Sequence, residues 1–278
     1  MSADKTKKTS QTASKGGKSK GAKKTAPKKD TQSVVTTHSP KGVELTTYTE
    51  VNRIYRQTLS QMRGTLVITS TFPGEGASTL AHVLALRSAD SGQKTLLIDL
   101  NMRSAGITSA FGVERHKWNL AKRKTNEPLT DVIDPVEKVP NLHVLAAPHD
   151  DESVQFLRDV HAASQLFANL EHHYDHIVVD TTPLQAVNRY NADPLMLAAA
   201  ATRTVLVLLA GQTAKDKVQN SVRAIEDAGA NLEGILVNDA RNPTLKEQLL
   251  RFAGDLEKLS SSLGKWLKTK INDAQWLS

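Results

Sequence analysis

Cysteine is absent from this 278-residue chain, which excludes disulfide bonds and thiolate-ligated metal sites. No stretch offers the roughly 18 to 20 consecutive apolar residues that a membrane-spanning helix needs. The first residues also lack the apolar core of a secretory signal. We therefore expect a cytoplasmic protein, and the 39% hydrophobic content suffices for one substantial core.

Aromatic residues are absent and acidic residues rare in residues 1–42, which hold eleven lysines, no arginine and only Asp4 and Asp30. This segment has a formal charge of +9, whereas the 25 basic and 27 acidic residues of the remainder sum to −2. Because it has almost nothing to bury, we expect a disordered tail. Its lysines could contact an anionic membrane at about 1 kcal/mol each, bind nucleic acid, or only solubilise the protein. The lack of arginine and aromatics makes nucleic acid the less favoured partner.

From about Leu45 onward, strand-like and helix-like segments alternate, which predicts a doubly wound α/β fold: a mostly parallel sheet with helices on both faces. The pattern predicts a domain at 43–243 between the tail and a C-terminal amphipathic helix at 244–278. Apolar runs that suit buried strands are Thr65–Ser70, Thr95–Asp99, Leu142–Ala146, His176–Asp180, Thr204–Ala210 and Leu232–Asn238. Helices are expected at Ser78–Asp90, Ser153–His173, Ala192–Ala200, Asp216–Ala228 and from about Thr244.

Candidate helix ends support these boundaries. Ser153 and Asp216 suit N-terminal caps, and Gly92 and Gly229 stand where helices end. The stretch Ala105–Pro140 contains several glycines and prolines, so we expect loops and short helices there.

The segment from Thr65 to Leu80, TLVITSTFPGEGASTL, joins a predicted strand to a predicted helix through a glycine-containing loop. This is the layout of a phosphate-binding loop, G-x-x-x-x-G-K-[ST]. There, backbone N–H groups hold phosphates, the lysine reaches the β and γ oxygens, and the hydroxyl binds Mg²⁺. Gly76 and Ser78 occupy the second glycine and hydroxyl positions, but Ala77 occupies the lysine position and Thr71 the first glycine position. The sequence therefore predicts a nucleotide-binding architecture without its principal cation.

Two further predicted strands end in carboxylates, Asp99 and Asp180. Ligands of open α/β sheets bind outside the carboxyl ends of the strands, so we expect both aspartates beside the Ser78 hydroxyl. Mg²⁺ prefers one or two carboxylates, waters and phosphate oxygens. Either aspartate alone would indicate only a solvated strand end or a helix cap; with the loop, they predict a Mg²⁺ site of Ser78, Asp99 and Asp180.

The C-terminal segment repeats apolar residues at helical spacing, with lysines among them. Such a stripe suits a helix that lies in a membrane interface or a terminal helix packed on the sheet or on a partner, and packing is slightly favoured. The apolar residues are Leu256, Leu259, Leu263, Trp266, Leu267, Ile271 and Trp276.

Four motifs occur together over roughly Thr47 to Asn242. Pro73–Thr79 reads PGEGAST, Leu96–Arg103 reads LLIDLNMR, and Tyr174–Pro183 reads YDHIVVDTTP. Glu50, Arg53 and Arg56 form an E-x-x-R-x-x-R pattern, which alone would indicate an ordinary charged helix face. With these motifs the chain resembles the bacterial tyrosine kinases (BY-kinases) of capsule and exopolysaccharide systems, within the MinD/ParA-like P-loop ATPases. The motifs are similar to that family's phosphate loop, Walker A′ segment (D-x-D-x-R), Walker B strand and subunit-contact helix.

The resemblance implies ATP or ADP with Mg²⁺ as cofactor and peripheral association with the inner membrane. It also implies an inner-membrane polysaccharide co-polymerase or synthase as partner, and a homo-oligomer or a hetero-oligomer with a related ATPase, through Glu50, Arg53 and Arg56. The implied catalytic residues are Asp99, Asn101, Arg103 and Asp180. The implied nucleotide contacts are Gly74, Glu75, Gly76, Ala77, Ser78 and Thr79, and the implied metal ligands are Ser78, Asp99 and Asp180.

Three departures from the family pattern weaken the catalytic expectation. Ala77 removes the lysine, Asn101 replaces the second Walker A′ aspartate, and no tyrosine follows Tyr190. Phosphoryl transfer depends on positioning and electrostatics, so we expect weak or lost nucleotide binding and a regulatory or scaffolding role in exopolysaccharide or capsule production. The alternatives are an active MinD/ParA-type ATPase that positions a cargo at membrane or nucleoid, and a weakly active kinase that uses Arg103 or a partner's cation.

Overall fold

The computed structural model describes residues 36–37, 49–123, 129–239, 265 and 268–269. Most of the lysine-rich tail and most of the C-terminal segment therefore lie outside the described residues. Two tail residues, Thr36–Thr37, form a short strand beside the end of the last strand, a contact that the composition of the tail does not predict.

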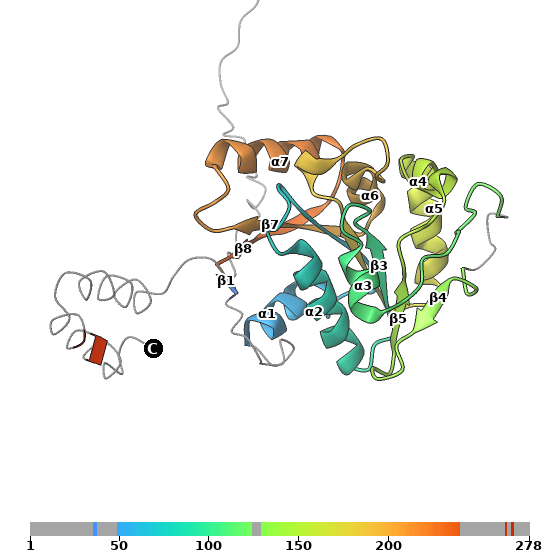
Figure 1. The fold of residues 1–278 in the computed structure, drawn as a ribbon, viewed down its shortest axis with the longest axis horizontal. Coiled ribbons are helices and arrows are strands. Elements are labelled where there is room, and N and C mark those ends of the chain that lie inside the picture. Colours follow the sequence, from blue (N-terminus) through green and yellow to red (C-terminus); the bar gives the residue numbers. More distant parts are fainter. Residues whose placement is uncertain (1–35, 38–48, 124–128, 240–264, 266–267, 270–278) are drawn as a thin grey trace, which may run out of the picture. The chain divides into compact units, whose positions relative to one another are not determined.

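Eight strands form one sheet in the order β1-β8-β7-β2-β6-β3-β5-β4 (Figure 1). Every pair is parallel except β4 with β5. The predicted doubly wound, mostly parallel α/β fold is therefore confirmed. The strands are β1 (Thr36–Thr37), β2 (Gly64–Ser70), β3 (Thr95–Leu100), β4 (Ile133–Pro135), β5 (Leu142–Leu145), β6 (His176–Thr181), β7 (Arg203–Leu209) and β8 (Leu232–Asn238).

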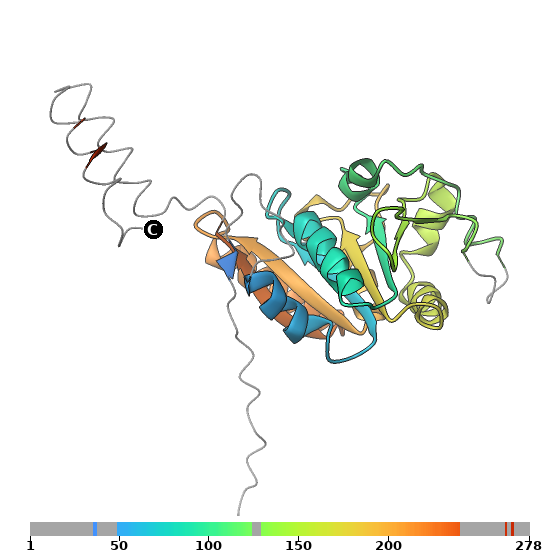
Figure 2. The same ribbon diagram turned by 90° about the horizontal axis from the view of Figure 1, so that it is seen from below.

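Helices cover both faces of the sheet, so the four central strands β7, β2, β6 and β3 are buried along their whole length. One face packs on α1 (Thr49–Thr58), α2 (Ala77–Asp90) and α3 (Gly106–Phe111). Figure 2 shows α1 and α2 side by side there. The other face packs on α5 (Val160–Glu171), α6 (Pro194–Ala200) and α7 (Lys215–Asp227).

The single helix predicted for Ser153–His173 is two helices, α4 (Asp151–Phe156) and α5. Asp150 caps α4 by accepting a hydrogen bond from the Ser153 N–H, and Asp159 caps α5 by accepting one from the Ala162 N–H. The cap predicted at Ser153 is wrong, because an aspartate three residues earlier accepts from that residue's own amide.

The cap predicted at Asp216 is also wrong. α7 begins at Lys215 after Ala214, which offers no side-chain cap. By contrast, the helix ends predicted from Gly92 and Gly229 are confirmed, and both glycines adopt positive φ (82° and 79°).

His176 links the strand layer to α2 through a buried polar chain. The Nδ1 atom of His176 lies 2.7 Å from the Ser88 hydroxyl, which lies 2.7 Å from the Thr95 hydroxyl. Burial, the main cause, lowers the pKa of His176, and burial likewise lowers the pKa of His82 and His143.

We expect acid to destabilise the fold through His176. The unfolded chain protonates this histidine near pH 6.5, whereas the folded protein resists protonation. The unfolded state therefore binds more protons below that pH, and the stability contribution is lost as pH falls. Denaturant titrations at pH 7.5 and 5.5 should show a smaller stability loss for His176→Gln than for the parent. An equal loss in both proteins would contradict a role for His176.

Candidate functional site

The predicted phosphate loop connects β2 to α2. Gly74 and Gly76 have φ values of 86° and 103°, and Gly76 caps α2 in the left-handed conformation. A Cβ atom on Gly76 would lie 2.5 Å from the Asn238 Nδ2 atom and displace that side chain, and the positive φ itself favours glycine there. That Nδ2 atom also donates a 3.0 Å hydrogen bond to the Glu75 carbonyl, which ties the loop to the end of β8.

Glu75 turns inward under the loop and is only 3% exposed. Its carboxylate accepts a 2.8 Å hydrogen bond from the Phe72 N–H and another from the Thr213 hydroxyl, just before α7. Thr71, at the first glycine position, contacts the Ser221 hydroxyl of α7 at 3.0 Å. The Glu75 side chain therefore braces the loop, and its predicted nucleotide contact stays a prediction.

Ala77 begins α2 and packs into the hydrophobic cluster beneath the loop, with 6% of its surface exposed. The next two residues, Ser78 and Thr79, are half-buried and exposed, respectively. The loop therefore presents a hydroxyl at the expected place and a methyl group where the lysine side chain would begin.

The register of the sheet brings Asp99 and Asp180 together: they are direct partners across the β3–β6 pair. Both are fully buried. Neither carboxylate oxygen of Asp180 has a hydrogen-bond partner of good geometry among the described residues. Burial, the main cause, raises the pKa of Asp180 to about 8, and the Asp99 charge adds to the rise while the nearby Ser78 and Asn101 oppose it.

Asp99 is surrounded by hydrogen-bond donors. Its carboxylate accepts from the Thr108 N–H (2.9 Å), the Thr108 hydroxyl (2.7 Å) and the Asn101 N–H (3.1 Å). Burial still raises its pKa, against these bonds and the charge of Arg115. Asp99 therefore holds α3 to the end of β3. By contrast, both carboxylate oxygens of Asp180 could accept further bonds.

Asn101 occupies the position of the second Walker A′ aspartate. Its side-chain amide donates a 3.3 Å hydrogen bond to the Ser78 hydroxyl, and its own buried carbonyl oxygen has no partner among the described residues. The motif residues from three separate strand ends thus meet, as the sequence predicts. An asparagine carries no charge, so it cannot act as a base.

The two arginines near these aspartates differ in how they are held. Arg103 is exposed. Arg115, which sequence reasoning missed, donates to the carbonyls of Ala147 (3.1 Å) and Pro148 (2.5 Å). The charge of Arg115 also has a minor effect on Asp99, whose pKa it lowers, so this arginine is held within electrostatic reach of the site. Its position in the poorly readable stretch Ala105–Pro140 gave no signal.

The polar groups at this edge fit Mg²⁺. Asp180 is a buried carboxylate that lacks a well-formed hydrogen bond to any described residue and lies beside the Ser78 hydroxyl, and both are oxygen ligands of the kind that Mg²⁺ takes. Among the described residues, no group of three or more His, Cys, Asp or Glu could hold a metal alone. A bound Mg²⁺ would therefore depend on waters and phosphate oxygens for its other ligands. The role of Asp99 as a third ligand stays a prediction.

The α1 motif lies on a separate surface. Arg53 and Arg56 are exposed, Glu50 is half-buried, and none of the three forms an ion pair with another described residue. Arg53 and Arg56 line a shallow cavity of about 650 Å³ together with Arg87 of α2. This surface has basic groups available for a partner, and its role in subunit contact stays a prediction.

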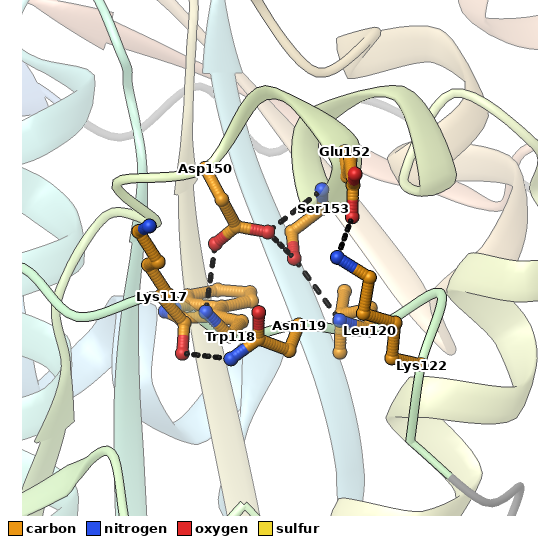
Figure 3. Close-up of polar contacts among 8 residues, drawn as sticks. All are labelled: Lys117, Trp118, Asn119, Leu120, Lys122, Asp150, Glu152 and Ser153. Atoms are coloured by element: carbon orange, nitrogen blue, oxygen red, sulfur yellow. Dashed lines mark hydrogen bonds and ion pairs between the residues drawn. The ribbon is translucent and has the colours of Figure 1, made fainter.

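A polar network fixes the segment 117–122 against α4, at the carboxyl end of β5 (Figure 3). The Asp150 carboxylate accepts from the Trp118 N–H at 2.8 Å, and the Ser153 hydroxyl accepts from the Leu120 N–H at 3.1 Å. The indole N–H of Trp118 donates to the Ala146 carbonyl at 3.0 Å, and this side chain is fully buried. These bonds join residues 118–120 to the start of α4.

None of the helices in the described part of the chain has the length and apolar character needed to cross a bilayer.

No protein-family model matches the chain, but individual kinases do. Tyrosine-protein kinase CpsD of Streptococcus agalactiae is 30% identical over 174 residues, which cover 62% of this chain and 74% of CpsD. Tyrosine-protein kinase YwqD of Bacillus subtilis is 27% identical over 219 residues, 74% of this chain and 86% of YwqD. The solved kinase domain of Escherichia coli tyrosine kinase ETK superposes with a TM-score of 0.57 at 25% identity, over 69% of this chain and 73% of that domain. The shared fold, the phosphate loop and the paired strand ends agree with these likenesses, and the chain belongs to the BY-kinase family of bacterial tyrosine kinases.

Proposed function

We propose that this chain is a BY-kinase family member that no longer transfers phosphate and acts as a regulatory or scaffolding component of capsule or exopolysaccharide production. The observation that carries the proposal is the methyl group of Ala77 at the start of α2, in the loop that faces the buried carboxylates Asp99 and Asp180. The site therefore has no cation at the lysine position and keeps two of the acids, Asp99 and Asp180.

Electrostatics weigh against a bound nucleotide. A unit charge about 4 Å from a phosphate oxygen is worth about 4 kcal/mol at an effective dielectric near 20, or about three decades of affinity. The loop amides and the N-terminus of α2 would still attract phosphate, but the Phe72 N–H is already bound by Glu75. The site is thus compatible with weak binding of Mg²⁺ with ATP or ADP. It is not compatible with efficient stabilisation of a phosphoryl-transfer transition state.

One observation favours a slow kinase as a second candidate. The Arg115 guanidinium uses two of its nitrogens on backbone carbonyls, and its charge reaches Asp99. An arginine so fixed could stabilise charge on a transferring phosphate. Arg115 would then supply the positive charge that the loop lysine supplies in the family pattern, but from a different side of the site.

Turnover of Mg-ATP separates the two candidates. We expect the parent protein to release ADP, or label tyrosine, no faster than a Ser78→Ala, Asp180→Ala double variant purified in the same way. Turnover well above that control would contradict the loss of phosphoryl transfer. In that case, loss of the activity in Arg115→Met would favour the slow kinase.

The proposed partner is an inner-membrane polysaccharide co-polymerase or synthase, reached from the cytoplasm at the inner membrane. Self-association, or association with a related active ATPase, would use Glu50, Arg53 and Arg56. Charged residues across such an interface set register and specificity more than affinity, and a closed ring or dimer needs complementary surfaces.

The α1 motif should govern assembly. We expect Glu50→Ala, Arg53→Ala, Arg56→Ala to shift the protein to its smallest species in sedimentation velocity and to reduce recovery of the partner several-fold in pull-downs. Lys215→Ala, Asp216→Ala, Lys217→Ala on exposed α7 is the matched control. If the α1 variant and the parent assemble equally, the motif has no role in assembly and is only a solvated helix face.

A further inference from the structure

An open groove of about 900 Å³ runs along the outer side of α2. It begins at Ser78 and Thr79 beside the phosphate loop and continues to Gly92 beyond the end of α2. α3 and residues 138–141 form its other wall. Its apolar lining comes from Val83, Leu86, Ile107, Ala110, Val139 and Pro140.

Several of these apolar side chains are accessible. Ala110 and Pro140 are exposed, and Leu86 and Val139 are half-buried. A groove of mixed exposed and half-buried apolar groups suits the apolar face of an amphipathic helix. The groove is also long enough for such a helix, because its α2 wall, Ser78 to Asp90, is about 20 Å long at 1.5 Å per residue.

The chain itself leaves the domain next to one end of this groove. Asn238, at the end of β8, bonds to the Glu75 carbonyl, and Ser78 lies only three residues further along the loop. The 39 residues after Asp239 therefore start beside the groove. A linker of residues 240–255 is long enough to reach either end of it, since extended chain spans about 3.3 Å per residue.

The apolar stripe in this C-terminal segment matches the groove in length and chemistry. Leu256, Leu263 and Ile271 bound a stretch with helical spacing, about 24 Å long as a helix. The described residues Lys265 and Lys268–Thr269 are helical, and the Thr269 hydroxyl bonds to the Lys265 carbonyl at 3.0 Å. At helical spacing Lys258, Lys265 and Lys268 lie outside the stripe and would remain in water.

We propose that the C-terminal segment 256–271 binds in the α2–α3 groove of its own chain, with its leucines and Trp266 on the apolar lining. Bound there, it would cover Ser78 and Thr79 from the side and occupy a surface that a partner could otherwise use. This contact does not depend on whether nucleotide binds, so it stands apart from the proposed function.

The absence of natural cysteine allows a direct cross-linking test in the full chain. Ala110→Cys places a thiol in the groove and Leu263→Cys places one in the stripe. The matched control pairs Leu263→Cys with Glu226→Cys, an exposed position on α7 across the sheet. With a short bismaleimide in dilute protein without lipid, the groove pair should give at least tenfold more intramolecular product than the control.

A second pair of variants separates docking from folding. In the groove-pair background, Leu259→Glu with Leu267→Glu should lower the cross-link yield at least tenfold. Lys258→Gln with Lys265→Gln, on the side of the helix opposite the stripe, should leave it unchanged. Equal yields for groove and control pairs would overturn the proposal. Products found only at dimer mass, rising with protein concentration, would overturn it in favour of the stripe of a second copy.

Discussion

Restoring the lysine should raise nucleotide affinity more than any other single change. In Ala77→Lys, an ammonium group within about 4 Å of a phosphate oxygen would add up to about 4 kcal/mol. We expect Mg-ADP and Mg-ATP to bind about a hundredfold to a thousandfold more tightly than to the parent. Isothermal titration calorimetry measures both directly.

The buried position of Ala77 requires a matched control. Its methyl group packs into the core, so a longer side chain must extend along the loop and keep its charged end in the site. Ala77→Met has a similar length without charge and shares the steric cost. Equal affinity of the Lys and Met variants would mean that the pocket is lost for reasons other than the missing charge.

Deleting the lysine-rich tail should remove most attraction to anionic vesicles. Removal of residues 1–35 takes away ten lysines and two aspartates and leaves the β1 residues Thr36–Thr37 in place. At about 1 kcal/mol per lysine near the surface, the loss should exceed tenfold in co-sedimentation with phosphatidylserine vesicles at low salt.

Salt identifies the electrostatic origin of this binding. At 0.15 M ionic strength the screening length is about 8 Å, so binding of the full-length protein should fall steeply with added salt, whereas the truncated protein should show little dependence. Neutral vesicles are the control for apolar contact. If the full-length protein ignores anionic vesicles at low salt, the tail serves another purpose, such as solubility or contact with nucleic acid or protein.

The strands and the strand-end residues of the site could be predicted, because they follow from regular sequence patterns. Strands buried on both faces follow from apolar runs, and the meeting of Asp99, Asp180 and Ser78 follows from the rule that parallel strands present their carboxyl ends at one edge. The antiparallel strand β4 was not predicted, because Ile133–Pro135 is only three residues long and contains a proline.

Contacts between loops that lie far apart in the chain could not be predicted from the sequence. From the sequence, Glu75 is expected to be a loop residue that faces a ligand. Its hydrogen bond from Thr213 forms only because the fold brings the segment before α7 next to the loop. Arg115 reads as one charge in an irregular stretch, and only the carbonyls after β5 give it a fixed place. Helix caps failed for a similar reason: Asp150 can cap α4 and also hold the Trp118 N–H, so it takes the position that Ser153 suggested.

Polysaccharide output in the native host tests the loss of phosphoryl transfer most directly. The chromosomal gene would be replaced by the Ser78→Ala, Asp180→Ala allele, by a deletion, or by the unchanged gene, with equal protein amounts checked by immunoblot. A component that works without phosphoryl transfer predicts near-normal polymer for the double variant and strongly reduced polymer for the deletion. Polymer reduced by the double variant as far as by the deletion would contradict it.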